Sequence, residues 1–202
     1  MKAVRKVVGM GMAALTDIAV GIVIVHLIGK VFGYNVPIYF YPFGVFLSLF
    51  PDIDYPYNLW YEWRKKKAHE SHRKFPHYPI VTIPFICCVL GILSIFWPIF
   101  IYWTVVAAFC LLGHYIHDSI EGQLRWLAPV GKKYYGLFTE KDGKKHFISS
   151  FSEKEWEAKW EDERLIIKDD REYFETYYLR PTKKSVMGGV LIVIAILLVW
   201  LW

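Results

Sequence analysis

Long apolar runs alternate along the chain with short clusters of charged residues and histidines. A helix needs roughly 17 to 25 apolar residues to cross a bilayer, and five runs approach or exceed that length: residues 7–32, 36–50, 79–97, 98–116 and 185–202. The second run is short and contains Pro37 and Pro42, so a partly buried or interfacial segment remains an alternative there. This pattern predicts an all-α polytopic membrane protein with about five transmembrane helices.

The only long polar segment separates the fourth and fifth runs. Ser152 and Glu155 have the spacing of a capping box, with Trp156 and Trp160 at i, i+4 after it. A second amphipathic helix is expected before Arg180-Pro181, and a turn is expected at Asp142-Gly143. We therefore divide the chain into a membrane-embedded domain (1–138), a cytoplasmic or interfacial helical segment (139–184) and a C-terminal anchor helix (185–202).

Composition supports membrane insertion, since 55% of the 202 residues are hydrophobic and 18% are aromatic. The net charge of +5 arises largely from basic residues beside the apolar runs, where they attract anionic headgroups. With five crossings, their distribution predicts a cytoplasmic N-terminus and an extracytoplasmic C-terminus. We recognise no nucleic-acid motif and expect no nucleic-acid partner. Three cysteines lie inside apolar runs without C-x-x-C spacing, which favours packing over metal binding: Cys87, Cys88 and Cys110.

Three polar clusters stand at the ends of apolar runs. They are PDID with Asp52 and Asp54, HESHRKFPH with His69, His72 and His77, and GHYIHD with His114, His117 and Asp118. Ionisable groups beside hydrocarbon are costly and usually mark a functional site. The predicted topology places all three clusters on the cytoplasmic side, which favours one shared site.

The spacing within the clusters is compatible with a metal site. If the fourth run stays helical, His114 and Asp118 are neighbours at i, i+4, with His117 and Glu121 nearby. A mixture of imidazoles and carboxylates suits zinc, manganese or iron better than calcium. Each cluster also has a simpler interpretation: a histidine–aspartate hydrogen bond at a helix end, an Asp52 helix cap, or a solvated basic loop.

The order of these motifs resembles a known family, the membrane-bound metal-dependent hydrolases related to the LexA-regulated inner-membrane protein YdjM. Its pattern is an early His, L-P-D-[IL]-D-H, H-R-G-x-T-H-S, H-x-x-x-D and a W-P-F-like element. The matching segments are FPDID (50–54), HRKFPH (72–77), HYIHD (114–118) and WLAP (126–129). Lys74 and Pro76 replace the Gly and Thr of the third element. The early position falls on Asp17 or His26, and Asp17 is favoured because it lies nearer the other motifs.

The resemblance implies a helical fold similar to zinc-dependent phospholipase C and P1 nuclease, with metal held among helices. The implied ligands are Asp17, Asp52, Asp54, His72, His77, His114, His117 and Asp118. The implied catalytic residues are Asp54, His72, Arg73 and His114, with the Arg73 guanidinium engaging phosphate.

The expected function is hydrolysis of a phosphoester at the cytoplasmic face of the inner membrane, on a lipid or lipid-linked substrate. Zinc is the preferred divalent metal, with manganese or magnesium as alternatives. Two other functions use the same residues: an ion or proton transporter, and a membrane scaffold with a structural metal site.

Overall fold

The computed structural model describes residues 14–54, 76–121, 123–158 and 183–201. Its helical elements are α2 (Leu15–Val31), the 3₁₀ helix η1 (Ile38–Phe40), α3 (Tyr41–Leu49), the 3₁₀ helix η2 (Phe50–Asp54), α5 (Pro79–Leu93), α6 (Ile99–Glu121) and α9 (Lys183–Leu201). Between α6 and α9 lie two strands, β1 (Tyr134–Lys141) and β2 (Lys144–Phe151).

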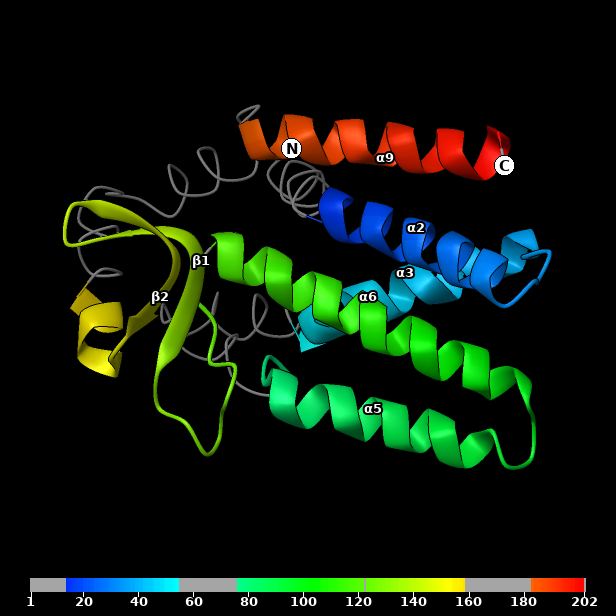
Figure 1. Cartoon of the computed structure of the whole chain (residues 1–202), viewed down its shortest axis with the longest axis horizontal. Coiled ribbons are helices and arrows are strands. Elements are labelled where there is room, and N and C mark those ends of the chain that lie inside the picture. Colours follow the sequence, from blue (N-terminus) through cyan, green and yellow to red (C-terminus); the bar gives the residue numbers. More distant parts are fainter. Residues whose placement is uncertain (1–13, 55–75, 122, 159–182, 202) are drawn as a thin grey trace, which may run out of the picture.

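Helix α6 lies at the centre of the helical part (Figure 1). It packs against α2, α3 and α5, while α9 packs on the other side of α2. The main core includes Val25 of α2 and Tyr102, Val106 and Cys110 of α6, all with no exposed surface. The long apolar runs therefore form helices that bury one another's faces.

Two glycines allow α2 and α3 to approach closely. A Cβ atom on Gly21 would lie 2.8 Å from the backbone oxygen of Gly44 and 2.9 Å from Cα of Val45. A Cβ atom on Gly44 would in turn lie 3.1 Å from the backbone oxygen of Gly21. Small residues at a helix crossing allow such backbone contact. Because η2 follows α3 directly, this crossing fixes where η2 lies relative to α2.

The all-α prediction is wrong, because β1 and β2 form an antiparallel hairpin. The turn predicted at Asp142-Gly143 is confirmed, and both residues have positive φ, at 53° and 71°. Two consecutive positive φ values are typical of a type I′ hairpin turn, whose twist matches that of the flanking strands. The segment 139–184 was expected to be helical, but its first part forms strands, which the Asp142-Gly143 turn joins.

A short helix follows β2, and its start agrees with the predicted capping box. The backbone N–H of Ser152 donates to Glu155 Oε2 at 2.6 Å, and the N–H of Glu155 donates to Ser152 Oγ at 3.3 Å. The hydrogen bonds from Ser152, together with the nearby Lys141 ammonium, lower the pKa of Glu155 to about 2. Trp156 stacks on Tyr134 of β1, with ring centroids 4.5 Å apart. Trp160 and the second predicted amphipathic helix lie outside the described residues.

The prediction of about five transmembrane helices is also wrong for the part of the chain that the structure describes. There, one helical segment, Ile99–Ile120, is long and apolar enough to cross a membrane. The apolar helical segments Ile38–Ile53, Pro79–Leu93 and Gly188–Leu201 are shorter, and α2 has 17 residues. The apolar runs are longer than the helices because they also contain turn residues. An example is Trp97-Pro98, which lies between α5 and α6. The predicted orientation of the termini depended on five crossings, so it is no longer supported.

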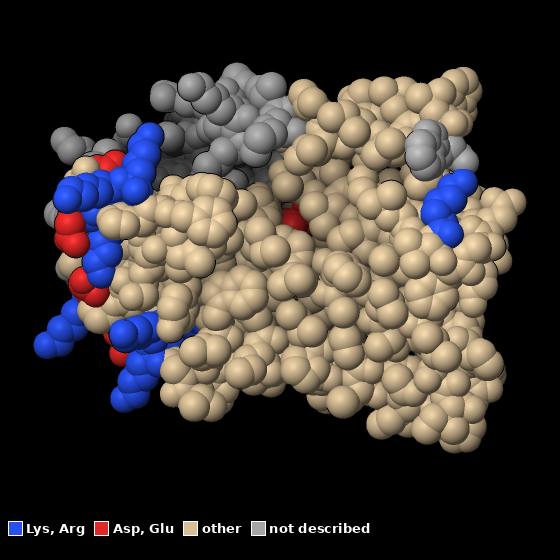
Figure 2. All heavy atoms as spheres, viewed as in Figure 1, with Lys and Arg blue, Asp and Glu red and all other residues tan. Residues whose placement is uncertain are grey.

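Charge is nonetheless distributed unevenly over the surface. In the view of Figure 2, charged side chains gather mainly around the hairpin end, and the face over the helices is almost uncharged. Many large apolar side chains on these helices are exposed, for example Phe85 (56%), Ile101 (51%) and Val193 (56%). A broad apolar surface of this kind suits contact with lipid.

Candidate metal centre

Four segments that are distant in sequence meet at the hairpin end of the helical part (Figure 1). Asp17 lies in the first turn of α2 and Asp52 lies in η2. His77 directly precedes α5, while His114 and Asp118 lie near the end of α6. The direction in which each helix runs thus brings at least one residue of each polar cluster close to Asp17.

Four side-chain atoms form a compact group at this point. His77 Nε2 lies 3.2 Å from Asp52 Oδ1 and 3.6 Å from Asp118 Oδ2. His114 Nε2 lies 3.8 Å from the same Asp52 oxygen and 3.4 Å from the same Asp118 oxygen. Zinc bonds of roughly 2.0–2.1 Å in tetrahedral geometry separate neighbouring ligand atoms by roughly 3.3–3.4 Å. The four nitrogen–oxygen distances given above are close to this ligand–ligand separation.

Asp52, His77 and His114 are a candidate metal-binding triad, since each offers a ligand atom and these atoms lie within 4.8 Å of one another. Asp118 adds a fourth donor at the distances given above. His114 is fully buried, and neither of its ring nitrogens makes a hydrogen bond of good geometry with any described residue; Nε2 is the one that faces Asp52 and Asp118. A buried imidazole nitrogen facing two carboxylates without such a bond fits a bound cation.

Asp17 lies on the opposite side of the His114 ring. Its Oδ1 is 3.3 Å from His114 Nδ1, and its Oδ2 is 3.3 Å from His117 Nδ1. A carboxylate at Nδ1 favours the tautomer with hydrogen there, which leaves Nε2 as the metal-binding atom. With only 3% of its side chain exposed, Asp17 is well placed to orient both histidines.

Two hydroxyl groups that the sequence analysis missed hold His77 in place. Thr82 Oγ1 and the Tyr115 hydroxyl both donate to the backbone oxygen of Pro76, at 2.8 Å and 2.9 Å. They fix the residue before His77 from α5 and α6. The proline of the HRKFPH motif is thus part of the support for a ligand, and only the three-dimensional structure reveals its partners.

The WLAP motif has a structural role beside the same helix. Trp126 Nε1 donates to Ser119 Oγ at 2.8 Å, and Ser119 Oγ donates to the backbone oxygen of Tyr115 at 2.7 Å. The Trp126 ring also packs edge-on against Tyr115. This motif therefore stabilises the end of α6, where the candidate ligands lie.

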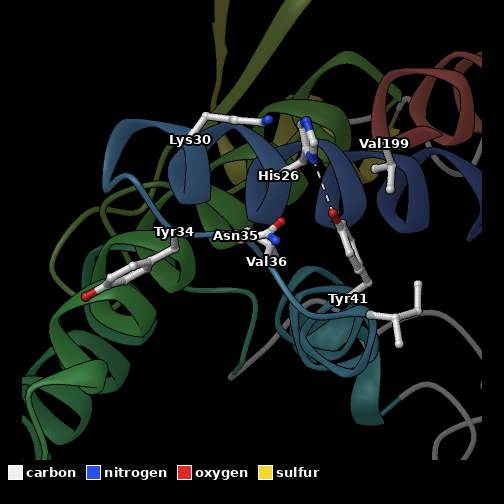
Figure 3. A pocket seen from close by; sticks show the side chains of 8 residues that line it. His26, Lys30, Tyr34, Asn35, Val36, Tyr41 and Val199 are labelled. Carbon is white, nitrogen blue, oxygen red and sulfur yellow. Dashed lines mark hydrogen bonds between the residues drawn. The ribbon is translucent and has the colours of Figure 1, made fainter. Parts of the chain in front are cut away.

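Several candidates fall elsewhere. His72 and Arg73 lie outside the described residues, as do the side chains of Asp54 and Glu121. His26 is not part of the group: it lies further along α2 than Asp17, and its Nδ1 is 3.1 Å from the hydroxyl of Tyr41 in α3 (Figure 3). His146 is exposed on β2. Of the predicted ligands, the structure brings together Asp17, Asp52, His77, His114, His117 and Asp118, and metal binding by each stays a prediction.

A protein-family model described as YdjM inner membrane protein matches residues 12–202. The chain belongs to the YdjM inner membrane protein family. The resemblance inferred from the four sequence motifs is thereby confirmed, and the match extends over every residue of the candidate metal centre. No curated protein and no solved structure matches the chain. The YdjM family assignment identifies an inner membrane protein and leaves the chemistry to the site itself.

The position of Asp17 leads to a prediction for this YdjM family member. Asp17→Asn removes the charge that orients His114 and His117 but keeps the shape of the side chain, so we expect zinc affinity to fall about 10- to 100-fold. The measurement is competition of the detergent-purified protein with a chromophoric zinc chelator. The control is Glu153→Gln, which removes an exposed carboxylate near the hairpin. Equal affinities in both variants would leave Asp17 as a packing residue.

Proposed function

We propose that the protein is a metal-dependent hydrolase that cleaves a phosphoester in a lipid or lipid-linked substrate at the membrane surface. The observation that supports it is the group formed by Asp52, His77, His114 and Asp118, whose separations match those of metal ligands. Asp52, His77 and His114 would hold a divalent ion, most simply zinc, with manganese or magnesium as alternatives, and would leave the position beside Asp118 for water or substrate.

The exposure of the four side chains favours a reactive centre over an enclosed structural site. His77 and His114 are 2% and 0% exposed, whereas Asp52 and Asp118 are 36% and 29% exposed. The imidazole side is therefore fixed by packing, and the carboxylate side is open to water or substrate. Structural zinc sites have four protein ligands and no open position, while catalytic sites keep one accessible.

A metal ion in this position would supply Lewis acidity, which activates water and polarises a phosphoryl oxygen. The side chains of the protein would position the ion and accept the proton. Buried His77 and His114 keep their ring nitrogens in place, and Asp17 orients the His114 ring. The partly exposed carboxylate of Asp118 lies next to the same space, 3.4 Å from His114 Nε2, so it is suited to receive a proton from the attacking water.

Arg125 provides a group for the phosphate. Its guanidinium carbon lies 5.9 Å from the ring centre of Tyr78, the neighbour of ligand candidate His77, and 5.7 Å from that of Tyr134. One guanidinium nitrogen donates to the backbone oxygen of Gly131, while Nε makes no hydrogen bond with the described residues. A guanidinium held between two aromatic rings, one of them adjacent to His77 in the sequence, is well suited to bind phosphate.

The place of the site along α6 favours a lipid substrate. At about 1.5 Å per residue, the 23 residues of α6 extend about 34 Å, close to the roughly 30 Å of a bilayer core. His114 and Asp118 lie near one end of this helix. An α6 that crosses the membrane would hold the centre at the level of the lipid headgroups, where phosphoesters are abundant.

The proposal is tested by purifying the full chain, removing metal with a chelator and reconstituting it in proteoliposomes. Zn²⁺, Mn²⁺ or Mg²⁺ is then added to separate samples, and release of phosphate or headgroup is measured beside ion flux. We expect hydrolysis only after metal is restored, with no metal-dependent flux.

The other outcomes have distinct meanings. Metal-dependent flux without hydrolysis would favour transport, since buried acids and histidines also serve ion pathways. Tight metal binding with neither hydrolysis nor flux would favour a structural site in a membrane scaffold.

A further inference from the structure

The hairpin formed by β1 and β2 exposes large apolar side chains near its middle. Phe138 and Phe147 lie opposite each other on the two strands, since their neighbours Leu137 and Ile148 are paired. The two rings meet edge to face with centroids 4.9 Å apart, and each residue is 64% exposed. Ile148 is 59% exposed. The two phenylalanines, called the aromatic pair below, thus contact each other but are largely uncovered by the rest of the protein.

The backbone of Phe138 is consistent with a role for this pair outside the folded core. Its φ is 51°, in the left-handed region that is disfavoured for a bulky side chain. An exposed ring also gains little from burial within the protein. Backbone strain of this kind often persists where function requires it. The folded chain alone therefore gives no reason for an aromatic residue at this position.

The hairpin is attached to the protein just after the end of α6. The backbone N–H of Leu124 donates to the oxygen of Tyr135 at 2.9 Å, and the N–H of Tyr135 donates to the oxygen of Leu124 at 2.8 Å. Figure 1 shows the two strands running across this end of the helical part and not along the helices. An α6 that crosses the membrane would therefore hold the hairpin along the headgroup layer.

Lysines flank the aromatic pair on both sides along the hairpin. Lys132 and Lys133 directly precede β1, and Lys144 and Lys145 begin β2. All four residues are exposed. In Figure 2, lysine and arginine side chains project at this end of the molecule. Long lysine side chains can keep their ammonium groups at the headgroups while apolar neighbours lie deeper.

The charge of this segment stays positive when its acidic residues are included. Residues 132–148 contain five lysines and two acidic residues, Glu140 and Asp142, which gives a net charge of +3. Lys141 is paired with Glu155, whose Oε1 lies 3.1 Å from its Nζ. The four exposed lysines still outnumber the two acidic residues of the segment. Lysines near the surface of a membrane are attracted to anionic headgroups.

We propose that the hairpin docks on the membrane surface, with the aromatic pair inserted at the interface and the four flanking lysines on anionic headgroups. The partner is anionic phospholipid of the leaflet beside the metal centre. Aromatic side chains next to lysines are typical of segments that lie in the membrane interface. Docking does not depend on the proposed hydrolase activity, because none of these residues belongs to the metal centre.

The test compares the full chain in two kinds of nanodisc. One contains dioleoyl phosphatidylcholine, and the other also contains dioleoyl phosphatidylglycerol, so the discs differ in headgroup charge and not in acyl chains. Brief exposure to hydroxyl radicals oxidises aromatic side chains that water reaches, and mass spectrometry gives the oxidised fraction of Phe138 and Phe147. We expect both phenylalanines to be oxidised several-fold less in the anionic discs.

A charge variant tests the role of the lysines. Lys144→Gln should lower the ratio of docked to undocked hairpin in the anionic discs about fivefold, which is the effect of one lysine near an anionic surface. Lys30→Gln carries the same charge change in the last turn of α2 and should leave the protection of the aromatic pair unchanged. Equal effects of the two variants would overturn the assignment of charge to the hairpin.

A second variant separates docking from folding. Phe138→Gly removes one ring and relieves the strain, because glycine adopts a positive φ readily. The unfolding temperature in dodecyl maltoside should therefore stay the same or rise, while Phe147 loses its protection in the anionic discs. Protection of Phe147 that persists in this variant would overturn the role of the aromatic pair.

Two further results would overturn the proposal as a whole. One is equal oxidation of the parent protein in the two kinds of nanodisc. The other is protection already present in dodecyl maltoside that rises with protein concentration, which would assign the aromatic pair to a contact between copies of the chain. Zinc content should match that of the parent in every variant, so a failure of docking is distinguishable from a failure of the metal centre.

Discussion

Replacement of His114 by alanine is expected to remove tight metal binding and phosphoester hydrolysis together. His114 has no exposed surface, and its Nε2 lies 3.4 Å and 3.8 Å from carboxylate oxygens of Asp118 and Asp52. Because the loss of an outer-shell partner already lowers metal affinity about 10- to 100-fold, the loss of a ligand should exceed 100-fold. Zinc content after dialysis and phosphate release in proteoliposomes are the two measurements.

The matched control is His146→Ala, since His146 is an exposed histidine on β2. It should keep both zinc content and activity. Because His114→Ala also opens a space in the protein, thermal melting should be recorded for both variants. A folded His114→Ala protein that retains zinc at the parent stoichiometry would rule out the four-residue group as the metal site.

Replacement of Gly21 by valine is expected to have the largest effect on stability. The first added carbon would lie 2.8–3.0 Å from backbone atoms of Gly44 and Val45, so α2 and α3 must separate. Overpacking of a well-packed core costs about 1–3 kcal/mol, and the cost rises when backbone must move. Since η2 follows α3, the same displacement should move Asp52 relative to Asp17 and lower zinc affinity.

The measurements are the unfolding temperature in detergent and zinc affinity of the folded fraction. Gly91→Val is the matched control, because Gly91 lies inside α5 and a Cβ there would meet nothing within 4 Å. It carries the same change in helix propensity without the collision. Equal unfolding temperatures for the two variants would show that the α2–α3 crossing tolerates a wider spacing.

The sequence predicted the candidate site better than the fold. Polar residues stood out because each lies at the end of an apolar run, and the i, i+4 spacing of His114 and Asp118 already made them neighbours. Asp17 was favoured over His26 by its position along α2, and the structure places Asp17 beside His114. The free-energy cost of placing ionisable side chains beside apolar segments therefore indicated which residues lie close together.

The hairpin was missed because the turn signal was not combined with the strand-forming residues on either side of it. Asp142-Gly143 indicated a turn, but the flanking residues Tyr134–Phe138 and His146–Phe151 are rich in aromatic and β-forming side chains, which together with Asp-Gly indicate a hairpin. The span count failed because an apolar run gives no direct measure of helix length. Thr82 and Tyr115 gained roles only through contacts between distant segments, which spacing within the sequence cannot reveal.

The contact between Asp52 and His77 also has a topological consequence. These residues are 25 positions apart, yet their side chains meet at 3.2 Å. An ion shared by them would close the intervening chain into a loop, as a covalent crosslink does, and would restrict the unfolded chain more than the folded one. The entropy removed from an unfolded loop of this size corresponds to about 3.5 kcal/mol for a disulfide. An ion bound for hydrolysis would thus also crosslink η2 to the residues that precede α5 and stabilise the folded chain.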